Sequence, residues 1–403
     1  MRVLLVGGPF PALSETFIVA HFTGLLDRGV DAHYWGSSGN AAAWAAYPGL
    51  AEKVRGRLHV HTPSARPLRT AREALTGGFN RRVVDAARGQ APGVAARRLL
   101  AGAKVAGLNP DLIHFEFGLG ALGTTWMGDV AECPLVVSMR GYDVNYAGLD
   151  QPGYFDEVWD RVDALHCLGE DMWQRSLRRG CPPDMPHRLI PPAVDVSRFT
   201  PAEQAERDGP LVVLTVARLH WKKGHEYGLL AVRELIDSGV AVEYRVVGAG
   251  PHADAVHACV EDLNLGRHVR MLGALPPAAV LEEMRGADMF LHPAVSEGFG
   301  NAVMEAQAAA LPVVCTDADG LRENIADGET GFAVARRDPS ALAAALARLA
   351  ADRDLRRQMG EAGRRRVSEH FDPARQVDAF VALYEETITA AGRRPRRSSA
   401  PAG

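Results

Sequence analysis

The sequence is poor in the features that mark secreted, disulfide-bonded and membrane-spanning proteins. Its 403 residues include only five cysteines, which are scattered and odd in number. Such spacing suits neither a disulfide framework nor a cysteine-rich metal site, so we expect reduced thiols in a cytoplasmic protein. No apolar run reaches the roughly 18 residues of a membrane-spanning helix, and the apolar run before Gly7 is too short for a signal peptide.

An excess of charge of one sign is also absent from the chain as a whole. The net charge is −4 at pH 7, which argues against a nucleic-acid-binding protein. One segment departs from this balance, because residues 52–105 hold twelve lysines or arginines against three acidic residues. Two interpretations stay open: a solvated helical face, or a peripheral contact with anionic membrane lipid or a lipid-diphosphate acceptor.

Short apolar runs alternate with helical patterns along the chain. Hydrophobic residues make up 47% of the sequence, enough for buried cores in two or three domains. The runs Val3–Val6, Leu112–Phe115, Leu135–Met139 and Ala164–Leu168 predict strands of a first sheet, and Leu211–Val216 restarts the pattern. Strands that alternate with helices predict an α/β fold with doubly wound, Rossmann-like parallel sheets.

A proline-rich stretch, 190–209, separates the two patterns and suits a linker. We therefore expect a first Rossmann-like domain over 1–195 and a second over 196–372. An amphipathic helix is expected over 373–391, from the apolar spacing of Val377, Phe380, Val381 and Tyr384. The arginine-, proline- and serine-rich end, 392–403, predicts a disordered tail.

The segment that begins at Ser296, SEGFGNAVMEA, carries the first chemical motif. Gly298 and Gly300 predict a turn before a helix that starts at Asn301, and a helix N-terminus favours a bound phosphate. Glu297 and Glu305 would repel a phosphate, so they make sense as acceptors of hydrogen bonds from neutral hydroxyls. A nucleotide sugar supplies both partners. The alternative is a helix with acidic residues in its early turns.

The second motif is VARLHWKKG, which follows the strand Leu211–Val216. Arg218, Lys222 and Lys223 crowd a single strand-to-helix loop, where their charge would neutralise a leaving diphosphate. A solvated charged loop is the alternative. A dinucleotide-binding dehydrogenase is disfavoured, because the turn after Val3–Val6 reads GGPFPAL rather than GxGxxG.

These motifs together resemble a known family. ARLxxKKG, then VVGAGP at 246–251, then EGFGNAVMEA and PVVCTDADGLRENIADGETGF are similar to the nucleotide-binding half of retaining glycosyltransferases of family 4. The seven residues between Glu297 and Glu305 match that family's E-x7-E spacing. FPALSETFI at 10–18 resembles a subgroup that builds exopolysaccharides, including colanic-acid-type enzymes, and IPPAVDVSRF at 190–199 resembles the domain junction.

The resemblance implies the GT-B fold, in which two Rossmann-like domains face each other across a cleft. It also implies a donor site in the second domain. Arg218 and Lys223 would bind the diphosphate, Glu305 the ribose, and Glu297 the transferred sugar. The other donor-binding residues implied are Gly248, Phe299, Gly300 and Asn301. No metal or other cofactor is expected, and the triplet Asp317–Asp319 is interpreted as a chance match to a metal-binding DxD motif.

The first domain would choose the acceptor through Ser14, Glu15, His114 and Glu116. Two positions depart from the family pattern. Glu116 stands where the subgroup often has a second histidine, and Arg140 stands where the family usually has a histidine that faces the reacting sugar. Arg140 is therefore expected to be catalytic, holding a sugar hydroxyl or a charged group. The alternative for both positions is a polar residue at a strand end.

The expected reaction moves a sugar from a nucleotide diphosphate sugar to an acceptor hydroxyl with retention of configuration. Such chemistry serves polysaccharide, glycolipid or natural-product biosynthesis. The acceptor would attack on the face from which the diphosphate departs. Two alternatives stay open, a GT-B sugar-nucleotide epimerase and a non-catalytic sugar-nucleotide sensor. Replacing Arg218 or Lys223 by alanine is expected to weaken donor binding and leave thermal stability near that of the parent.

Overall fold

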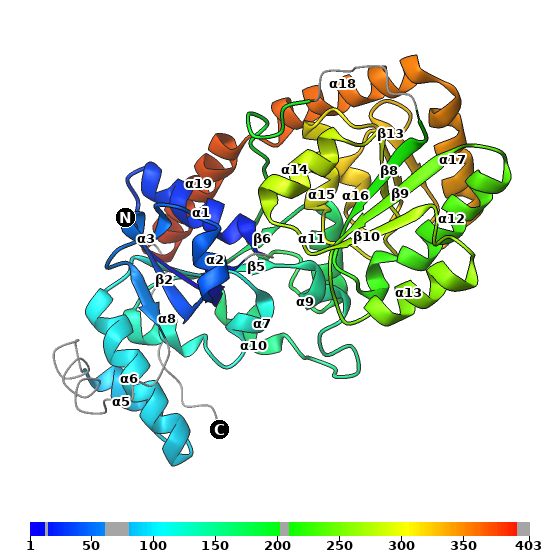
Figure 1. Cartoon of the computed structure of the whole chain (residues 1–403). Coiled ribbons are helices and arrows are strands. Elements are labelled where there is room, and N and C mark those ends of the chain that lie inside the picture. The colour runs from blue at the N-terminus through cyan, green and yellow to red at the C-terminus, as the bar shows by residue number, and fades with distance from the viewer. Residues whose placement is uncertain (13–14, 61–79, 202–208, 393–403) are drawn as a thin grey trace. The chain divides into compact units, whose positions relative to one another are not determined.

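The computed structural model describes residues 1–12, 15–60, 80–201 and 209–392, and the chain divides into two compact units (Figure 1). The first unit holds Met1–Cys167, Trp173–Ile190 and the residues from Ala374 onward. The second unit holds Leu168–Met172 and Pro191–Pro373. The chain therefore leaves the first unit after Ile190 and returns to it with its last helix.

The first unit is built on a sheet of seven strands within the described residues, in the order β3-β2-β1-β4-β5-β6-β7. All neighbouring strands are parallel. Their bounds are β1 (Arg2–Phe10), β2 (Asp31–Ser38), β3 (Leu58–Val60), β4 (Leu112–Phe115), β5 (Leu135–Met139), β6 (Ala164–Cys167) and β7 (His187–Leu189). The central strands are buried along their length, as expected for a parallel sheet covered on both faces.

Helices surround this sheet. Their bounds are α1 (Thr16–Asp27), α2 (Ala41–Ala45), α3 (Leu50–Lys53), α5 (Arg81–Ala87), α6 (Pro92–Leu108), α7 (Gly118–Ala121), α8 (Trp126–Ala131), α9 (Gly141–Asn145), α10 (Asp156–Arg161), α11 (Glu170–Arg178) and α19 (Pro373–Gly392). The last helix, α19, packs beside α1 (Figure 1) and buries Val377, Phe380 and Tyr384 in the core of the first unit. On the surface, Arg28 donates a hydrogen bond of 2.7 Å to Asp378 and ties α1 to α19.

The second unit has a parallel sheet of six strands within the described residues, in the order β10-β9-β8-β11-β12-β13. Their bounds are β8 (Leu211–Val216), β9 (Val242–Val247), β10 (Val269–Gly273), β11 (Met289–His292), β12 (Val313–Thr316) and β13 (Gly331–Val334). The helical elements are the 3₁₀ turn η1 (Trp221–Lys223), α12 (His225–Asp237), α13 (Ala253–Asp262), α14 (Pro277–Arg285), α15 (Asn301–Ala308), α16 (Leu321–Asn324), α17 (Pro339–Ala351) and α18 (Arg353–His370).

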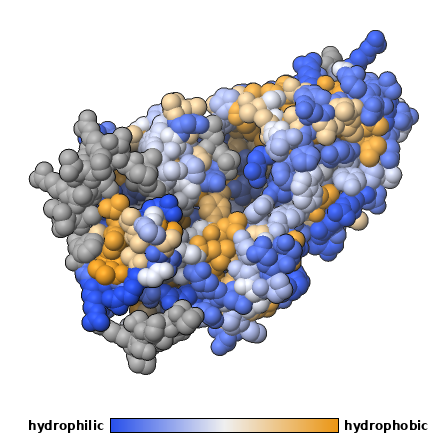
Figure 2. Space-filling view, turned by 90° about the horizontal axis from the view of Figure 1, so that it is seen from below, coloured by the Kyte–Doolittle hydropathy of each residue, from blue (hydrophilic) through white to orange (hydrophobic). Residues whose placement is uncertain are grey.

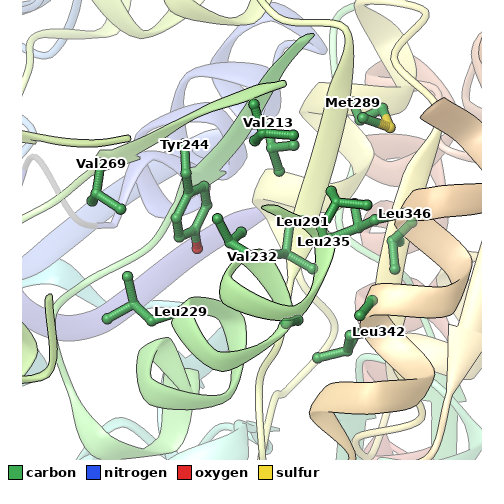
Figure 3. Packing of buried hydrophobic residues seen from close by; sticks show 14 of the residues in the cluster. Val213, Leu229, Val232, Leu235, Tyr244, Val269, Met289, Leu291, Leu342 and Leu346 are labelled. Atoms are coloured by element: carbon green, nitrogen blue, oxygen red, sulfur yellow. The ribbon is translucent and has the colours of Figure 1, made fainter. Parts of the chain in front are cut away.

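One hydrophobic cluster joins this sheet to α12 and α17 (Figure 3). Leu229, Val232 and Leu235 recur at helical spacing and turn one face of α12 to the strands. Tyr244 of β9 is also buried, and its hydroxyl is satisfied by Thr215 Oγ1 at 2.8 Å. The packing of α12 fixes the loop before it, which begins at the carboxyl end of β8.

The strands expected from apolar runs are all present, but β2, β3 and β7 were not anticipated. β2 reads DAHYWGSS and β7 reads HRL, so neither shows a continuous apolar run. β2 pairs with β1 and β7 pairs with β6, and both of these neighbours were predicted from apolar runs. β3 pairs with β2. Their strand state therefore depends on pairing and not on local pattern.

The visible face in Figure 2 is largely hydrophilic, with hydrophobic residues in separate patches. Among the described residues, no helix has both the length and the apolar character needed to cross a bilayer.

The contact between α1 and α19 depends on a missing side chain at Gly24. A Cβ placed there would lie 2.5 Å from Val377 Cγ2. We expect Gly24→Ala to lower the free energy of unfolding by about 1–2 kcal/mol, the cost of overpacking less the gain in helix propensity. The control is Gly93→Ala in α6, where a Cβ would meet no described atom within 4 Å. Equal stability of the two variants in urea unfolding would contradict this account of the packing.

Candidate functional site

Sheet topology brings two distant loops of the second unit together. β8 and β11 are neighbours, with Val213 opposite Met289, while the chain after β8 continues to β9 on the other side. Such a change of direction opens a crevice at the carboxyl ends of the two strands. The loops after β8 and β11 carry the basic motif and the glutamate motif, which explains why residues more than seventy positions apart meet.

The basic loop is held by backbone contacts. Gly224 follows η1 with φ +64°, and a Cβ there would lie 2.1 Å from the carbonyl oxygen of Pro293. Only glycine fits this left-handed position so close to the next loop. In return, the Val295 N–H donates a hydrogen bond of 2.8 Å to the carbonyl oxygen of Lys222. The two loops therefore form one backbone-linked structure.

The Glu297 carboxylate is the centre of this structure. Its Oε2 forms an ion pair with Lys223 Nζ and accepts a hydrogen bond of 3.0 Å from His292 Nε2. Its Oε1 accepts the Gly298 N–H at 3.0 Å. Burial lowers the pKa of His292, so its ring is neutral and donates through Nε2. Burial alone would raise the pKa of Glu297, but Lys223 and His292 hold it well below its usual range.

This geometry corrects the expectation that Lys223→Ala leaves stability unchanged. The side chains of Lys223 and Glu297 are only 13% and 14% exposed. Removal of Lys223 would leave a mostly buried carboxylate without its cation, which is strongly destabilising. A loss of donor binding in that variant would therefore not separate binding from folding.

Asp319 fixes the start of the loop that carries Glu297. Its Oδ2 accepts hydrogen bonds from Ser296 Oγ at 2.6 Å and from the Glu297 N–H at 2.9 Å. Its Oδ1 lies 3.2 Å from Arg336 Nη1, and Asp317 pairs with Arg322 at 2.9 Å. The Asp317–Asp319 triplet is thus engaged by arginines and by the loop that it positions.

A buried amide fixes the turn before α15. Gly300 adopts φ +87°, and Asn324 Nδ2 donates to the carbonyl oxygens of Phe299 and Gly300 at 2.9 and 3.0 Å. Gln307 Nε2 in turn donates to Asn324 Oδ1 at 2.9 Å. The first N–H groups of α15 have no partner inside the helix, so the turn presents donors and the positive end of a helix dipole.

Two further cations stand near Lys223. Arg218 is exposed, and it makes no ion pair within the part of the chain that the structure describes. Lys222 is half-buried, and burial together with the nearby charges of Lys223 and Arg218 lowers its pKa. Lys223 is paired with Glu297, whereas Arg218 makes no ion pair with the residues that the structure describes, so its charge is available to an anion.

Glu305 lies in the second turn of α15, apart from this cluster. Its carboxylate accepts no hydrogen bond from the described residues, and burial raises its pKa to about 7. A half-buried carboxylate that lacks protein donors can accept hydrogen bonds from a ligand.

Gly248 has a different role from the one expected for it. It adopts φ +148° after β9, and a Cβ there would lie 1.9 Å from the carbonyl oxygen of Ala217. Its N–H donates to the carbonyl oxygen of Gly273 at 2.8 Å. Gly248 thus permits the close approach of the loops after β8 and β9, and its own N–H is already used.

In the first unit, the two departures from the family pattern contact each other. Arg140 Nη2 lies 3.1 Å from Glu116 Oε2, and Arg140 Nε donates to the Glu116 carbonyl oxygen at 3.1 Å. The guanidinium also lies over the Phe17 ring, 4.4 Å from its centroid. The two positions that depart from the family resemblance are therefore coupled, because the charge at each one is the partner of the charge at the other.

The four residues expected to select the acceptor differ in burial, and one of them lies outside the described residues. His114 and Glu116 are buried, and their nitrogen and oxygen atoms are engaged within the unit, so direct acceptor contact is not what this structure supports. Glu15 is half-buried immediately before α1, and its role stays a prediction. Ser14 lies outside the described residues.

Three buried side chains could in principle approach a metal ion. The potential ligand atoms of His21, His114 and Glu116 lie within 4.8 Å of one another. They are already bonded to one another or to Tyr384, and Arg140 places a further positive charge beside Glu116. We therefore interpret this group as a hydrogen-bonded cluster. The expectation that no metal is needed stays a prediction.

Three residues that support the site, His292, Asp319 and Asn324, were not among the site residues predicted from the sequence. His292 ends a predicted strand only five positions before Glu297, so its nearness was visible in the sequence. Asp319 was noticed and set aside as a chance match. Asn324 gave no signal, because a buried amide that bonds a distant turn leaves no local pattern.

The chain is similar in sequence to known glycosyltransferases. Residues 196–366 match the family model described as "Glycosyl transferases group 1". A proposed colanic acid biosynthesis glycosyltransferase, WcaL of Salmonella typhimurium, is 29% identical over 386 residues, which cover 90% of this chain and 94% of that protein. A D-inositol 3-phosphate glycosyltransferase of Corynebacterium jeikeium is 36% identical over 233 residues, covering 54% of this chain and 55% of that protein.

Solved structures show the same fold. HepE of Anabaena in complex with UDP has a TM-score of 0.73 at 16% identity and covers 96% of this chain and 100% of its own. Sucrose-phosphate synthase of Thermosynechococcus elongatus has a TM-score of 0.73 at 19% identity, with 97% and 100% covered. The expected α/β architecture, the GT-B fold with two Rossmann-like parallel-sheet domains, is confirmed.

The raised pKa of Glu305 predicts a pH dependence of stability. Between pH 4.5 and about 7, folded Glu305 holds a proton that the unfolded chain releases, so the free energy of unfolding falls as pH rises through this window. Glu305→Gln should remove this loss, on the order of 1–3 kcal/mol between pH 5 and 8. The control is Glu261→Gln, an exposed residue of α13. If urea unfolding gives parallel pH profiles for the parent and Glu305→Gln, the carboxyl is not desolvated.

Proposed function

We propose that this glycosyltransferase, whose residues 196–366 match the group 1 family model, moves a sugar from a nucleotide diphosphate sugar to an acceptor hydroxyl with retention of configuration. The retaining outcome rests on the resemblance of the E-x7-E and KKG motifs to family 4 enzymes. The second unit binds the donor, and the first unit selects the acceptor.

One observation carries the donor assignment. The loop with Arg218, Lys222 and Lys223 is joined to the loop with Glu297 by an ion pair and by backbone hydrogen bonds. The cations and the turn before α15 are thus linked to each other, and Glu305 follows in the second turn of α15. A nucleotide sugar matches this arrangement, because its anionic diphosphate lies between two neutral sugars.

These residues contribute to the reaction through electrostatic stabilisation. When the anomeric carbon parts from the diphosphate, negative charge builds on the phosphate oxygens, and Arg218, Lys222 and the α15 N-terminus stabilise it. Glu297 keeps Lys223 in place beside them. We assign no covalent nucleophile, and we propose that Glu305 binds the ribose. The acceptor hydroxyl attacks on the face that the diphosphate leaves, and a diphosphate oxygen takes its proton.

The two other functions that the sequence left open are not favoured. An epimerase or a sensor would also bind a nucleotide sugar, but the relatives that match most of the chain are named as glycosyltransferases. Their names support an acceptor in polysaccharide biosynthesis. We propose that no metal is required, because the loop cations supply the positive charge, and that the enzyme works in the cytoplasm.

Arg218→Ala tests the donor site cleanly, because Arg218 is exposed and has no ion-pair partner among the described residues. UDP-, GDP-, dTDP- and ADP-sugars are first titrated into the parent by calorimetry. For the sugar nucleotide that binds, Arg218→Ala should weaken binding about tenfold or more, the loss of a charge-assisted contact. Thermal stability should not change.

Arg267→Ala is the matched control. Arg267 is also exposed, but it lies before β10, at the amino end of the strand. Its removal should leave donor affinity unaltered. Equal affinities of the parent and Arg218→Ala would exclude Arg218 from the donor site, and a parent that binds none of the four donors would contradict the proposed function.

The basic segment supports a peripheral membrane contact. Arg81 and Arg88 of this segment are exposed at 91% and 75% of their side-chain surface, beside exposed Val84. We expect Arg81→Glu with Arg97→Glu to reduce sedimentation with anionic vesicles at low salt and to leave donor binding intact. Arg82 is left unchanged, because its ion pair with Glu132 joins α5 to the end of α8, whereas the ion pair of Arg81 with Asp85, at 3.6 Å, lies within α5. If the parent ignores anionic vesicles, the segment is a solvated face.

A further inference from the structure

A row of hydrogen bonds inside the first unit plays no part in the proposed reaction. We call it the buried chain. It runs from the Glu116 carboxylate through His21, Tyr384, His114, Ser138 and His166 to the carbonyl oxygen of Ile190, with successive distances of 2.8, 3.0, 2.6, 2.8, 2.6 and 2.8 Å. All six side chains are buried. Strands β4, β5 and β6 and helices α1 and α19 contribute to it.

A count of protons shows what the buried chain requires. At one end is a carboxylate and at the other a carbonyl oxygen, and both can only accept. Between them stand five groups (three histidines, a serine and a tyrosine) that carry one donatable proton each when neutral. The row has six hydrogen bonds and each needs a proton. One more proton must therefore be present than the neutral groups supply.

The surroundings decide where this proton lies. Burial lowers the pKa of His114 to about 3 and lowers that of His166 well below its usual range, so both rings are neutral. Arg140 Nη2 lies 3.1 Å from Glu116 Oε2 and holds that carboxylate ionised. His21 is the histidine of the row that contacts the Glu116 carboxylate, so the proton belongs to His21. The His21 ring also stacks on Phe380 at 4.0 Å, a contact that favours a cation.

We propose that His21 is held as an imidazolium, which donates through Nδ1 to Glu116 and through Nε2 to Tyr384, and that it is a positioning residue for Arg140 and for α19. Glu116 then sits between two cations, with Oε1 on His21 and Oε2 on Arg140. This arrangement fixes the guanidinium at the end of β5. It also ties α19 to the sheet through Tyr384. The proposal does not depend on glycosyl transfer.

The charged and titratable groups that face His21 come from several elements. They are Glu116 after β4, His114 in β4, Arg140 after β5 and Tyr384 in α19. Glu15, before α1, acts on Arg140. Loss of the extra proton would delete one hydrogen bond of the row and one of the two cations on Glu116.

Nitrogen NMR of the imidazole rings in the full chain tests the proposal directly. The His21 signals are assigned as those missing from His21→Gln. At pH 7 we expect both His21 nitrogens to be protonated, while His114 and His166 are single neutral tautomers. A neutral His21 would overturn the proposal. Spectra with and without EDTA should coincide, and a change on chelation would place a metal ion in the cluster and also overturn it.

Ser138→Ala tests the proton count without touching His21. It removes one group and two hydrogen bonds, which leaves four bonds and four one-proton groups, so no extra proton is required. We expect His21 to lose its second proton at a lower pH than in the parent. The control is Thr387→Val, whose buried hydroxyl bonds only its own helix at Leu383. If Ser138→Ala and the control titrate alike, the row does not hold the proton.

Discussion

The ion pair between Lys223 and Glu297 is the interaction on which the candidate donor site depends. It joins the loops that follow two neighbouring strands, and both side chains are mostly buried. A buried carboxylate is tolerated only with full compensation, and here a lysine, a histidine and a backbone N–H provide it. The pair also takes up the charge of Lys223, so the proposed anion-binding charge of this loop rests chiefly with the exposed Arg218.

The supports behind the ion pair are polar and buried. Asp319 holds the backbone of Glu297, and Asn324 holds the turn before α15. Because both carboxylate oxygens of Asp319 and both polar side-chain atoms of Asn324 have hydrogen-bond partners, the loops can present a preformed arrangement of charge to a ligand. The first unit uses the same principle around Glu116, which lies between His21 and Arg140.

Much of the fold could be predicted from the sequence, because the strands of a parallel sheet read as apolar runs. The motif loops could also be placed, since loops after such strands collect at one edge of the sheet. β2, β3 and β7 escaped prediction because their strand state comes from pairing. The burial of His114 and Glu116 was not predicted either. It depends on Tyr384 of α19, which approaches from 270 residues further along the chain.

Likewise, the partnership of Glu116 with Arg140 could not be inferred, because two unusual residues that follow separate strands give no local sign that they meet. Lys223 and Glu297 were each chosen for a ligand, yet the structure pairs them with each other. Single-residue roles taken from motifs thus pointed to loops that the structure brings together, while the contacts inside those loops required coordinates.

Hydrogen-exchange mass spectrometry on the full chain, with and without a bound sugar nucleotide, tests the central claim most directly. The account predicts that the donor slows exchange in 217–224 and 296–305, the loops joined by Lys223 and Glu297. The strand ends of the first unit should change less. Protection confined to the loops after β1, β4 and β5, with none in these two segments, would contradict the assignment of the donor to the second unit.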